Sequence, residues 1–198
     1  PVGIISNSGS LANILCRIAP QRGIRFSKAI SLGNECDLTS ADFLHYLAKD
    51  QETGLIGAYI EGIKDGARFF EALRTASLQK PVILWKVGLT SAGAQAAASH
   101  TGALAGDCNI WEGIVRQTGA VPVAGFEAWF DYLMGFTMLT DQLGDRIAII
   151  SGPGGLAVSA AEACAENKLR LASLSPETRK ALAEVVPPTG TSLRNPID

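Results

Sequence analysis

The sequence has little of several features that mark other classes of protein. Its 198 residues include only two histidines, and the formal net charge is −2. It holds no block of Lys and Arg and no basic stripe interleaved with aromatic residues, which argues against nucleic acid as a partner. Apolar runs are short and are broken by glycine, serine or charge, so we expect no transmembrane span and no membrane partner. No signal peptide is visible.

Cysteine is also scarce, and its spacing excludes the usual metal motifs. The four cysteines are far apart in the chain and form no C-x-x-C pair. With only two histidines to assist them, we expect neither zinc nor any other metal site. Buried free thiols of a cytoplasmic protein are the simpler interpretation. The cysteines are Cys16, Cys36, Cys108 and Cys164.

The composition is that of a core-forming protein, because 47% of the residues are hydrophobic and 18% are charged. The length suits one large domain, or one domain and part of another. The chain begins without Met on a strand-like segment, and it stops at Asp198, directly after a loop. We therefore expect an internal piece of a longer polypeptide.

Short β-branched runs alternate with longer stretches of helical periodicity. This alternation predicts an α/β fold, with a parallel sheet covered by helices on both faces. In such sheets, ligands bind at the carboxyl ends of the strands. We expect strands at 3–6, 26–31, 55–60, 82–86, 120–123, 146–151 and 170–173, and helices at 11–22, 40–49, 67–78, 107–118, 126–139, 156–166 and 176–185.

An internal repeat suggests two related units. Residues 3–12 read GIISNSGSLA and residues 148–157 read AIISGPGGLA, with six of ten positions identical. Each copy is a hydrophobic strand, a Gly/Ser loop and the start of a helix. We therefore predict one domain at 1–143 and the truncated beginning of a second, similar domain at 144–198.

The two Gly/Ser loops are candidate phosphate-binding sites. Small residues let backbone N–H groups approach an anion, and the following helix N-terminus favours negative charge. Tight turns and helix caps need the same residues, so one loop alone is a weak signal. The candidate residues are Ser6, Asn7, Ser8, Gly9 and Ser10 in the first loop, and Ser151, Gly152, Gly154 and Gly155 in the second.

His100 is the candidate catalytic histidine, because it stands in a run of small residues that leaves its ring open. We expect the stretch that leads to it, after the predicted strand 82–86, to be a Gly/Ser/Ala-rich loop. An imidazole in such a place can act as base, nucleophile or ligand, although a hydrogen-bonded loop histidine is the plain alternative. Glu61 follows a predicted strand and could orient an imidazole, or could simply cap a helix. Lys86 could serve an anion or could reach solvent. His45 fits the polar face of a helix and receives no role.

Together these residues resemble one family. Residues 80–106 read KPVILWKVGLTSAGAQAAASHTGALAG, which is similar to the phosphohistidine segment of the NDP-forming acyl-CoA synthetases, relatives of succinyl-CoA ligase. The segments at 5–10, 32–37, 60–63 and 146–198 also match. The resemblance implies a flavodoxin-like, three-layer domain followed by the start of a second one.

The resemblance also implies a role for each site residue. His100 would carry a phosphoryl group, Glu61 would orient the ring, and the two Gly/Ser loops would hold the phosphoryl group. In the family reaction, acyl-CoA, ADP and phosphate give the free acid, CoA and ATP. The 198 residues alone would be inactive. CoA, ATP or ADP and Mg²⁺ would bind with the help of CoA-binding and ATP-grasp domains, in an oligomer. Asn7 departs from the family, which more often has Gln there, and Trp85 is bulky for its position.

Two other interpretations stay open at this point. The chain could be a non-catalytic regulatory module that binds a CoA thioester or an anion on the same fold. It could also be a flavin-binding flavodoxin, although its loops lack the usual phosphate-cradle spacing and offer no aromatic pair at the expected strand ends.

Overall fold

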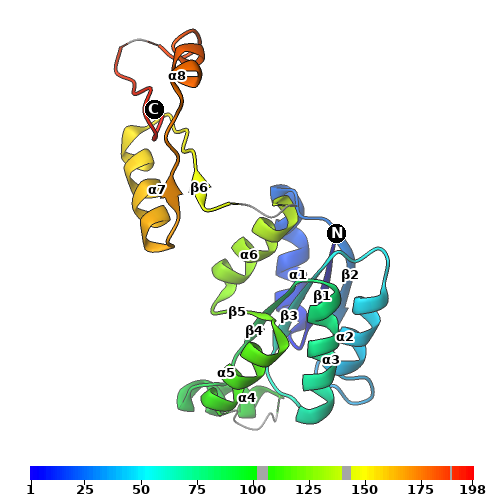
Figure 1. Ribbon diagram of the computed structural model, residues 1–198. Helices are drawn as coiled ribbons and strands as arrows, with labels where there is room; N and C mark the ends of the chain where they lie inside the picture. The colour runs from blue at the N-terminus through cyan, green and yellow to red at the C-terminus, as the bar shows by residue number, and fades with distance from the viewer. Residues whose placement is uncertain (102–106, 140–143, 188) are drawn as a thin grey trace. The chain divides into compact units, whose positions relative to one another are not determined.

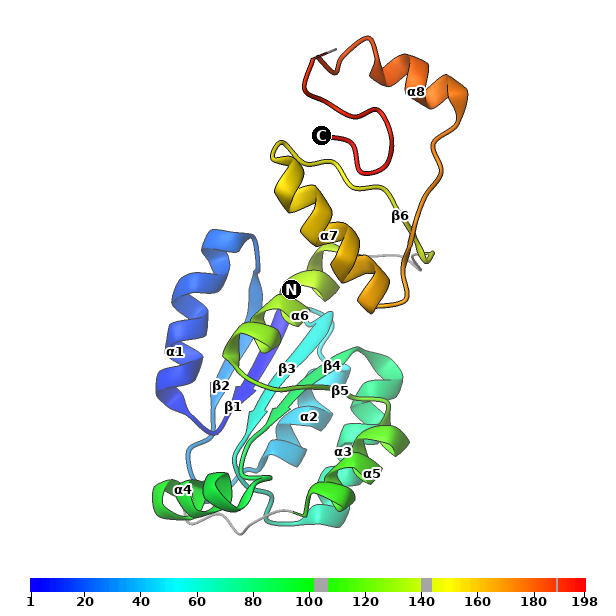
Figure 2. The ribbon, with the colours of Figure 1, turned by 90° about the vertical axis from the view of Figure 1, so that its left-hand side faces the viewer.

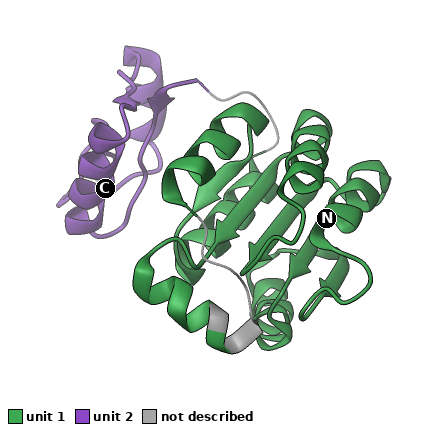
Figure 3. Ribbon diagram, turned by 90° about the horizontal axis from the view of Figure 1, so that it is seen from below, with its two compact units in different colours: residues 1–140 green, residues 141–198 purple. Residues whose placement is uncertain are grey.

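The structure is a computed structural model that describes all residues except 102–106, 140–143 and 188, and leaves out the side chains of residues 98, 100 and 101. The chain forms two compact units, Pro1–Thr140 and Asp141–Asp198. Figure 3 shows the two units in separate colours. Whether the second unit begins a domain of the same type stays a prediction.

The first unit is built on a five-stranded sheet with the order β2-β1-β3-β4-β5, and all of its strand pairs are parallel. Helices cover both faces, with α1 (Gly9–Ile18) and α6 (Phe126–Met138) on one side and α2 (Ser40–Lys49), α3 (Gly66–Gln79) and α5 (Cys108–Thr118) on the other (Figures 1 and 2). The predicted three-layer α/β fold is therefore confirmed. The strands are β1 (Val2–Ser6), β2 (Phe26–Ser31), β3 (Leu55–Ile60), β4 (Val82–Lys86) and β5 (Val121–Val123).

The burial of the strands follows their place in the sheet. The interior strand β1, which lies between β2 and β3, has every residue buried, as expected for a parallel strand covered on both faces. The edge strands are more open, and β5 carries Pro122, which suits an edge because proline cannot donate to a ladder. Apolar side chains pointing alternately to the two faces form two cores, one against α2, α3 and α5 and one against α1 and α6.

Polar side chains fix where several helices begin. Ser8 caps α1, Asp65 caps α3, and Asp107 caps α5 through side-chain oxygens that accept backbone N–H groups. Thr39 and Asp42 form a capping box at α2. The bounds are α1 (Gly9–Ile18), α2 (Ser40–Lys49), α3 (Gly66–Gln79), α5 (Cys108–Thr118) and α6 (Phe126–Met138).

Two sequence predictions in this unit need correction. The stretch before His100 was expected to be a Gly/Ser/Ala-rich loop, but Ser91–Thr101 forms a helix, α4. Alanine has the highest helix propensity, and this segment is rich in alanine. The predicted helix 11–22 is divided, because α1 ends at Ile18 and a short 3-10 helix, η1 (Ala19–Arg22), follows with Pro20 in its first turn.

The second unit contains a small two-stranded parallel sheet of β6 (Arg146–Ile147) and β7 (Arg170–Leu171), with α7 (Gly154–Glu166) and α8 (Pro176–Leu182). The predicted strand at 146–151 is longer than β6. Its second half pairs elsewhere, because Ile197 donates to Ile149 O at 2.9 Å and Ser151 donates to Ile197 O at 3.0 Å.

All four cysteines are free, and Cys36 and Cys108 are exposed, so the expectation of buried thiols is wrong for these two. Cys16 and Cys164 are partly buried. Among the helices of the described residues, none is both long and apolar enough to cross a membrane.

Candidate functional site

A pocket of about 410 Å³ lies where the carboxyl ends of the central strands meet. The helix α4 lies across this end of the sheet (Figure 2). Ligands bind at the carboxyl ends of parallel strands, so the pocket is where the fold predicts a site. Its lining comes from the β1–α1 loop, β3, the segment after β4, and α4: Ser8, Tyr59, Glu61, Val87, Gly88, Gly93, Ala96 and Ala97.

The loop between β1 and α1 is held by its own hydroxyl groups. The fully buried Ser6 Oγ accepts from Ser8 N at 3.1 Å and donates to Ser8 O at 2.7 Å. Ser8 Oγ accepts from Leu11 N at 3.3 Å, which caps the helix. The N–H groups of Gly9 and Ser10 stand in the first helical turn, where no intrahelical acceptor exists. The Ser8 and Ser10 hydroxyls lie 3.2 Å apart and share a hydrogen bond. The loop thus offers an anion two backbone donors and one hydroxyl hydrogen of this pair.

Asn7 is buried, and its hydrogen bonds run to other parts of the protein. Its backbone N donates to Tyr59 O at 3.1 Å. Its side-chain Nδ2 donates to Gly33 O at 3.1 Å and to Glu35 Oε1 at 3.0 Å. Its Oδ1 accepts from Glu61 N at 2.9 Å. Both amide hydrogens and the backbone N–H are therefore used, and Asn7 has no donor left for a phosphate.

Glu61 lies directly after β3, with only 5% of its surface exposed, and lines the pocket. Its backbone is held on both sides, because its N–H donates to Asn7 and its carbonyl oxygen accepts from Lys86 Nζ at 2.9 Å. Tyr59, two residues earlier, lies on the same face of the strand. Burial and the Glu61 carboxylate together raise the pKa of Tyr59 to about 12.

Lys86 is not a strand-end lysine that simply reaches solvent, and its role towards an anion stays a prediction. Its half-buried ammonium donates to the carbonyl oxygens of Glu61 and Val87, at the carboxyl ends of β3 and β4. Burial lowers the pKa of Lys86, and the nearby Glu61 carboxylate partly opposes this effect. The lysine thus places a positive charge beneath the pocket and fixes the chain on both sides of it.

His100 lies in the last turn of α4, but its side chain is outside the described residues. The pocket is lined from α4 by Gly93, Ala96 and Ala97. Residues three and four apart share one face of a helix, so position 100 falls on the same face as these three. The backbone register therefore agrees with a site for His100 beside the pocket. His45 is partly buried on α2.

The second Gly/Ser loop belongs to the second unit and is described on its own. Ser151 Oγ donates to Pro153 O at 3.1 Å, and α7 begins at Gly154. A Cβ atom on Gly154 would lie 2.6 Å from a carboxylate oxygen of Asp198, so this acid sits close to the helix N-terminus. Negative charge is favoured there. No local pattern in the sequence predicts that Asp198 lies beside this loop.

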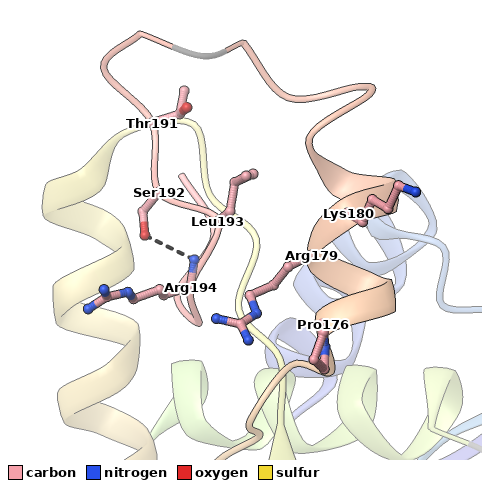
Figure 4. A pocket seen from close by; sticks show the side chains of 7 residues that line it. All are labelled: Pro176, Arg179, Lys180, Thr191, Ser192, Leu193 and Arg194. Atoms are coloured by element: carbon pink, nitrogen blue, oxygen red, sulfur yellow. Dashed lines mark hydrogen bonds between the residues drawn. The ribbon is translucent and has the colours of Figure 1, made fainter.

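The second unit also has a cavity of about 720 Å³ that the sequence did not predict (Figure 4). Its three cationic side chains are exposed, and Lys180 points away from the segment that carries Ser192. We assign this cavity no role, because no buried polar group lines it. The lining residues are Pro176, Arg179, Lys180, Thr191, Ser192, Leu193 and Arg194. Within the described ranges, no cluster of three or more His, Cys, Asp or Glu could hold a metal ion.

The chain is similar in sequence to several ADP-forming acetate–CoA ligases. The chain is 37% identical, over its whole length, to an ADP-forming acetate–CoA ligase of Methanocaldococcus jannaschii, and covers 28% of that protein. It is 39% identical to the alpha subunit of ADP-forming acetate–CoA ligase II of Pyrococcus furiosus, and covers 43% of it. The chain thus spans less than half the length of these relatives.

A solved structure agrees with these matches. The dinucleotide forming acetyl-coenzyme A synthetase 1 of Ca. Korarchaeum cryptofilum, in complex with phosphate and ADP, superimposes with a TM-score of 0.82 at 35% identity. All of this chain and 43% of that chain are covered. The family described as succinyl-CoA ligase like flavodoxin domain matches residues 1–136, which is nearly the whole first unit. The chain therefore belongs to the family of succinyl-CoA ligase like flavodoxin domains.

Proposed function

We propose that the chain is the phosphohistidine-carrying part of an NDP-forming acyl-CoA synthetase, with His100 as the phosphoryl carrier. The observation that carries this proposal is the pocket itself. It joins the Ser8 cap of α1, the buried Glu61 and the α4 face that includes position 100. Relatives named as ADP-forming acetate–CoA ligases support the same reaction class.

The proposed reaction passes a phosphoryl group through His100 in three steps. Phosphate displaces CoA from acyl-CoA to give an acyl phosphate. An imidazole nitrogen of His100 then attacks the phosphorus, the bond between phosphorus and the acyl oxygen breaks, and the free acid leaves. ADP then takes the phosphoryl group from His100 and becomes ATP. Such transfers depend mainly on positioning and on electrostatic stabilisation.

The residues of the pocket would divide this work. The backbone N–H groups of Gly9 and Ser10, with one hydroxyl hydrogen of the Ser8–Ser10 pair, would stabilise the phosphoryl oxygens at the N-terminus of α1. Glu61 would accept a hydrogen bond from the imidazole and fix its tautomer. Ser6 and Asn7 would shape the loop, because their side-chain donors are already used. In the second unit, taken by itself, the loop Ser151–Gly155 is a further candidate phosphate-binding loop, through the backbone N–H groups of Gly152, Gly154 and Gly155.

Other components would belong to the whole protein. CoA would bind a CoA-binding domain, and the nucleotide with Mg²⁺ would bind an ATP-grasp domain, on the same chain or on a partner subunit. The acid that the reaction releases, or activates in the reverse direction, would be a small carboxylic acid. The assembly would be an oligomer. The four free thiols suit the reducing cytoplasm.

The test is phosphorylation of the full-length protein by ATP labelled at the γ-phosphate, in the presence of Mg²⁺. We expect label that acid removes and base does not, and we expect His100→Ala to abolish it. His45→Ala is the matched control, because His45 is the other histidine of the chain, and it should label as the wild type does. Equal labelling of His100→Ala would overturn the proposal.

A further inference from the structure

The segment at 32–37 holds a buried acid to which the proposed mechanism gives no task. Glu35 is 4% exposed and has a positive φ of 53°, a backbone conformation that residues other than glycine rarely adopt. Three contacts hold it there. Its N–H donates to Leu32 O at 3.2 Å, its carbonyl oxygen accepts from Lys64 Nζ at 2.7 Å, and its carboxylate accepts from Asn7. Residues kept in such conformations cluster at functional sites.

The Glu35 carboxylate lies at one end of a buried chain of hydrogen bonds. Glu35 Oε1 accepts from Asn7 Nδ2 at 3.0 Å, and Asn7 Oδ1 accepts from Glu61 N at 2.9 Å. All three residues are at most 6% exposed. An amide has one oxygen side and one nitrogen side. The nitrogen of Asn7 also donates to Gly33 O at 3.1 Å, so the acceptors at Glu35 and Gly33 together turn the Asn7 oxygen towards Glu61.

We propose that Glu35, through Asn7, is a positioning residue for Glu61. The acceptor at position 35 holds the Asn7 amide with its oxygen towards the Glu61 N–H, and this fixes the backbone from which the Glu61 side chain extends into the pocket. The inference rests on the proposed function, because it concerns the orientation of the acid that would hold the imidazole. Small errors in such an orientation slow a reaction strongly.

The first test compares Glu35→Met with Glu35→Gln in the full-length protein. Both replacements are unbranched and of similar length, but glutamine keeps a carbonyl acceptor and methionine does not. We expect Glu35→Gln to be phosphorylated at His100 within about twofold of the wild-type rate, and Glu35→Met about tenfold more slowly, since a buried donor loses its partner. Equal rates for two folded variants would overturn the inference.

A second readout does not depend on activity. Hydrogen exchange of the Glu61 amide should be about tenfold faster in Glu35→Met than in Glu35→Gln, because its acceptor Asn7 Oδ1 is then held only through the bond from Asn7 Nδ2 to Gly33 O. Equal exchange would contradict the inference. If the wild type itself carries no label on His100, the proposed function fails, and hydrogen exchange still decides the orientation of Asn7.

A polarity swap covers the case in which Glu35→Met does not fold. Asn7→Asp places two carboxylates against each other, so we expect slow phosphorylation or loss of folding. Adding Glu35→Gln restores a donor at position 35 that faces an acceptor at position 7. It should recover part of the folding and rate, because the donor to Gly33 O stays missing. A double variant that is no better than Asn7→Asp would overturn the inference.

Discussion

The surroundings of Tyr59 in the pocket change the pKa of its hydroxyl group. Its ring packs edge-on against Trp85 with centroids 4.8 Å apart, and burial with the Glu61 carboxylate raises the pKa of Tyr59 to about 12. We expect the tyrosinate absorbance of the wild type, minus that of Tyr59→Phe, to rise with a midpoint near pH 12. A midpoint near pH 10, the ordinary value for tyrosine, would contradict this environment.

The same shift predicts how stability depends on pH. The folded protein holds the Tyr59 proton more tightly than the unfolded chain, so this contribution is complete below pH 10 and is lost as the pH rises towards 12. Over this window the wild type should lose about 1–2 kcal/mol more unfolding free energy than Tyr59→Phe, after allowance for solvent screening. Urea unfolding at several pH values measures the difference.

At the scale of helices and strands, α6 packs so closely on β3 that Gly57 has no room for a side chain. A Cβ atom there would lie 2.7 Å from Ile4 Cδ1 and 3.0 Å from Leu133 Cδ2, both in the core between the sheet and α6. We expect Gly57→Ala to lower the free energy of unfolding by about 1–3 kcal/mol, because overpacked cores must shift. Denaturant unfolding followed by tryptophan fluorescence measures this change.

Gly135 is the matched control, because it lies within α6 and a Cβ atom there would meet nothing within 4 Å. Alanine is favoured over glycine inside helices, so Gly135→Ala should raise the unfolding free energy by about 0.5–1 kcal/mol. If both variants changed stability equally, the packing account of Gly57 would be wrong.

The positions of most elements could be predicted from the sequence, because periodicity and helix caps are local signals. The strands at 26–31, 55–60 and 82–86 and the helix at 40–49 have the predicted bounds. The helix α4 was missed because its alanine and glycine content, without an apolar stripe, resembles a flexible loop. The predicted strand 146–151 is longer than the observed β6, because part of the predicted segment pairs instead with Ile197, which lies far along the chain.

The candidate site could be predicted only in part, because some of its contacts join residues that lie far apart in the chain. Ser8 and Glu61 each follow a predicted strand, and the rule for parallel sheets brings them together in one pocket. The task of Asn7 could not be predicted, because its partners are 26, 28 and 54 residues away. Only the folded chain shows that the Asn7 side chain donates to Gly33 O and Glu35 and accepts from the Glu61 N–H.

At the scale of the whole molecule, the first unit has a complete sheet covered on both faces. We therefore expect residues 1–140 to fold by themselves and to unfold in one cooperative transition. All three tryptophans, Trp85, Trp111 and Trp129, lie in this unit and report on it. Tryptophan fluorescence and near-ultraviolet circular dichroism should change together with denaturant. A broad transition, or loss of the near-ultraviolet signal without denaturant, would contradict this expectation.

The central claim is that His100 carries the phosphoryl group. Trypsin should release His100 on the peptide 87–116 and His45 on the peptide 29–49, so mass spectrometry can assign the phosphoryl group to one histidine. After brief incubation of the full-length protein with ATP and Mg²⁺, and digestion at alkaline pH, we predict a phosphoryl group on His100 in peptide 87–116. Phosphorylation of any other residue, with His100 unmodified, would contradict the account.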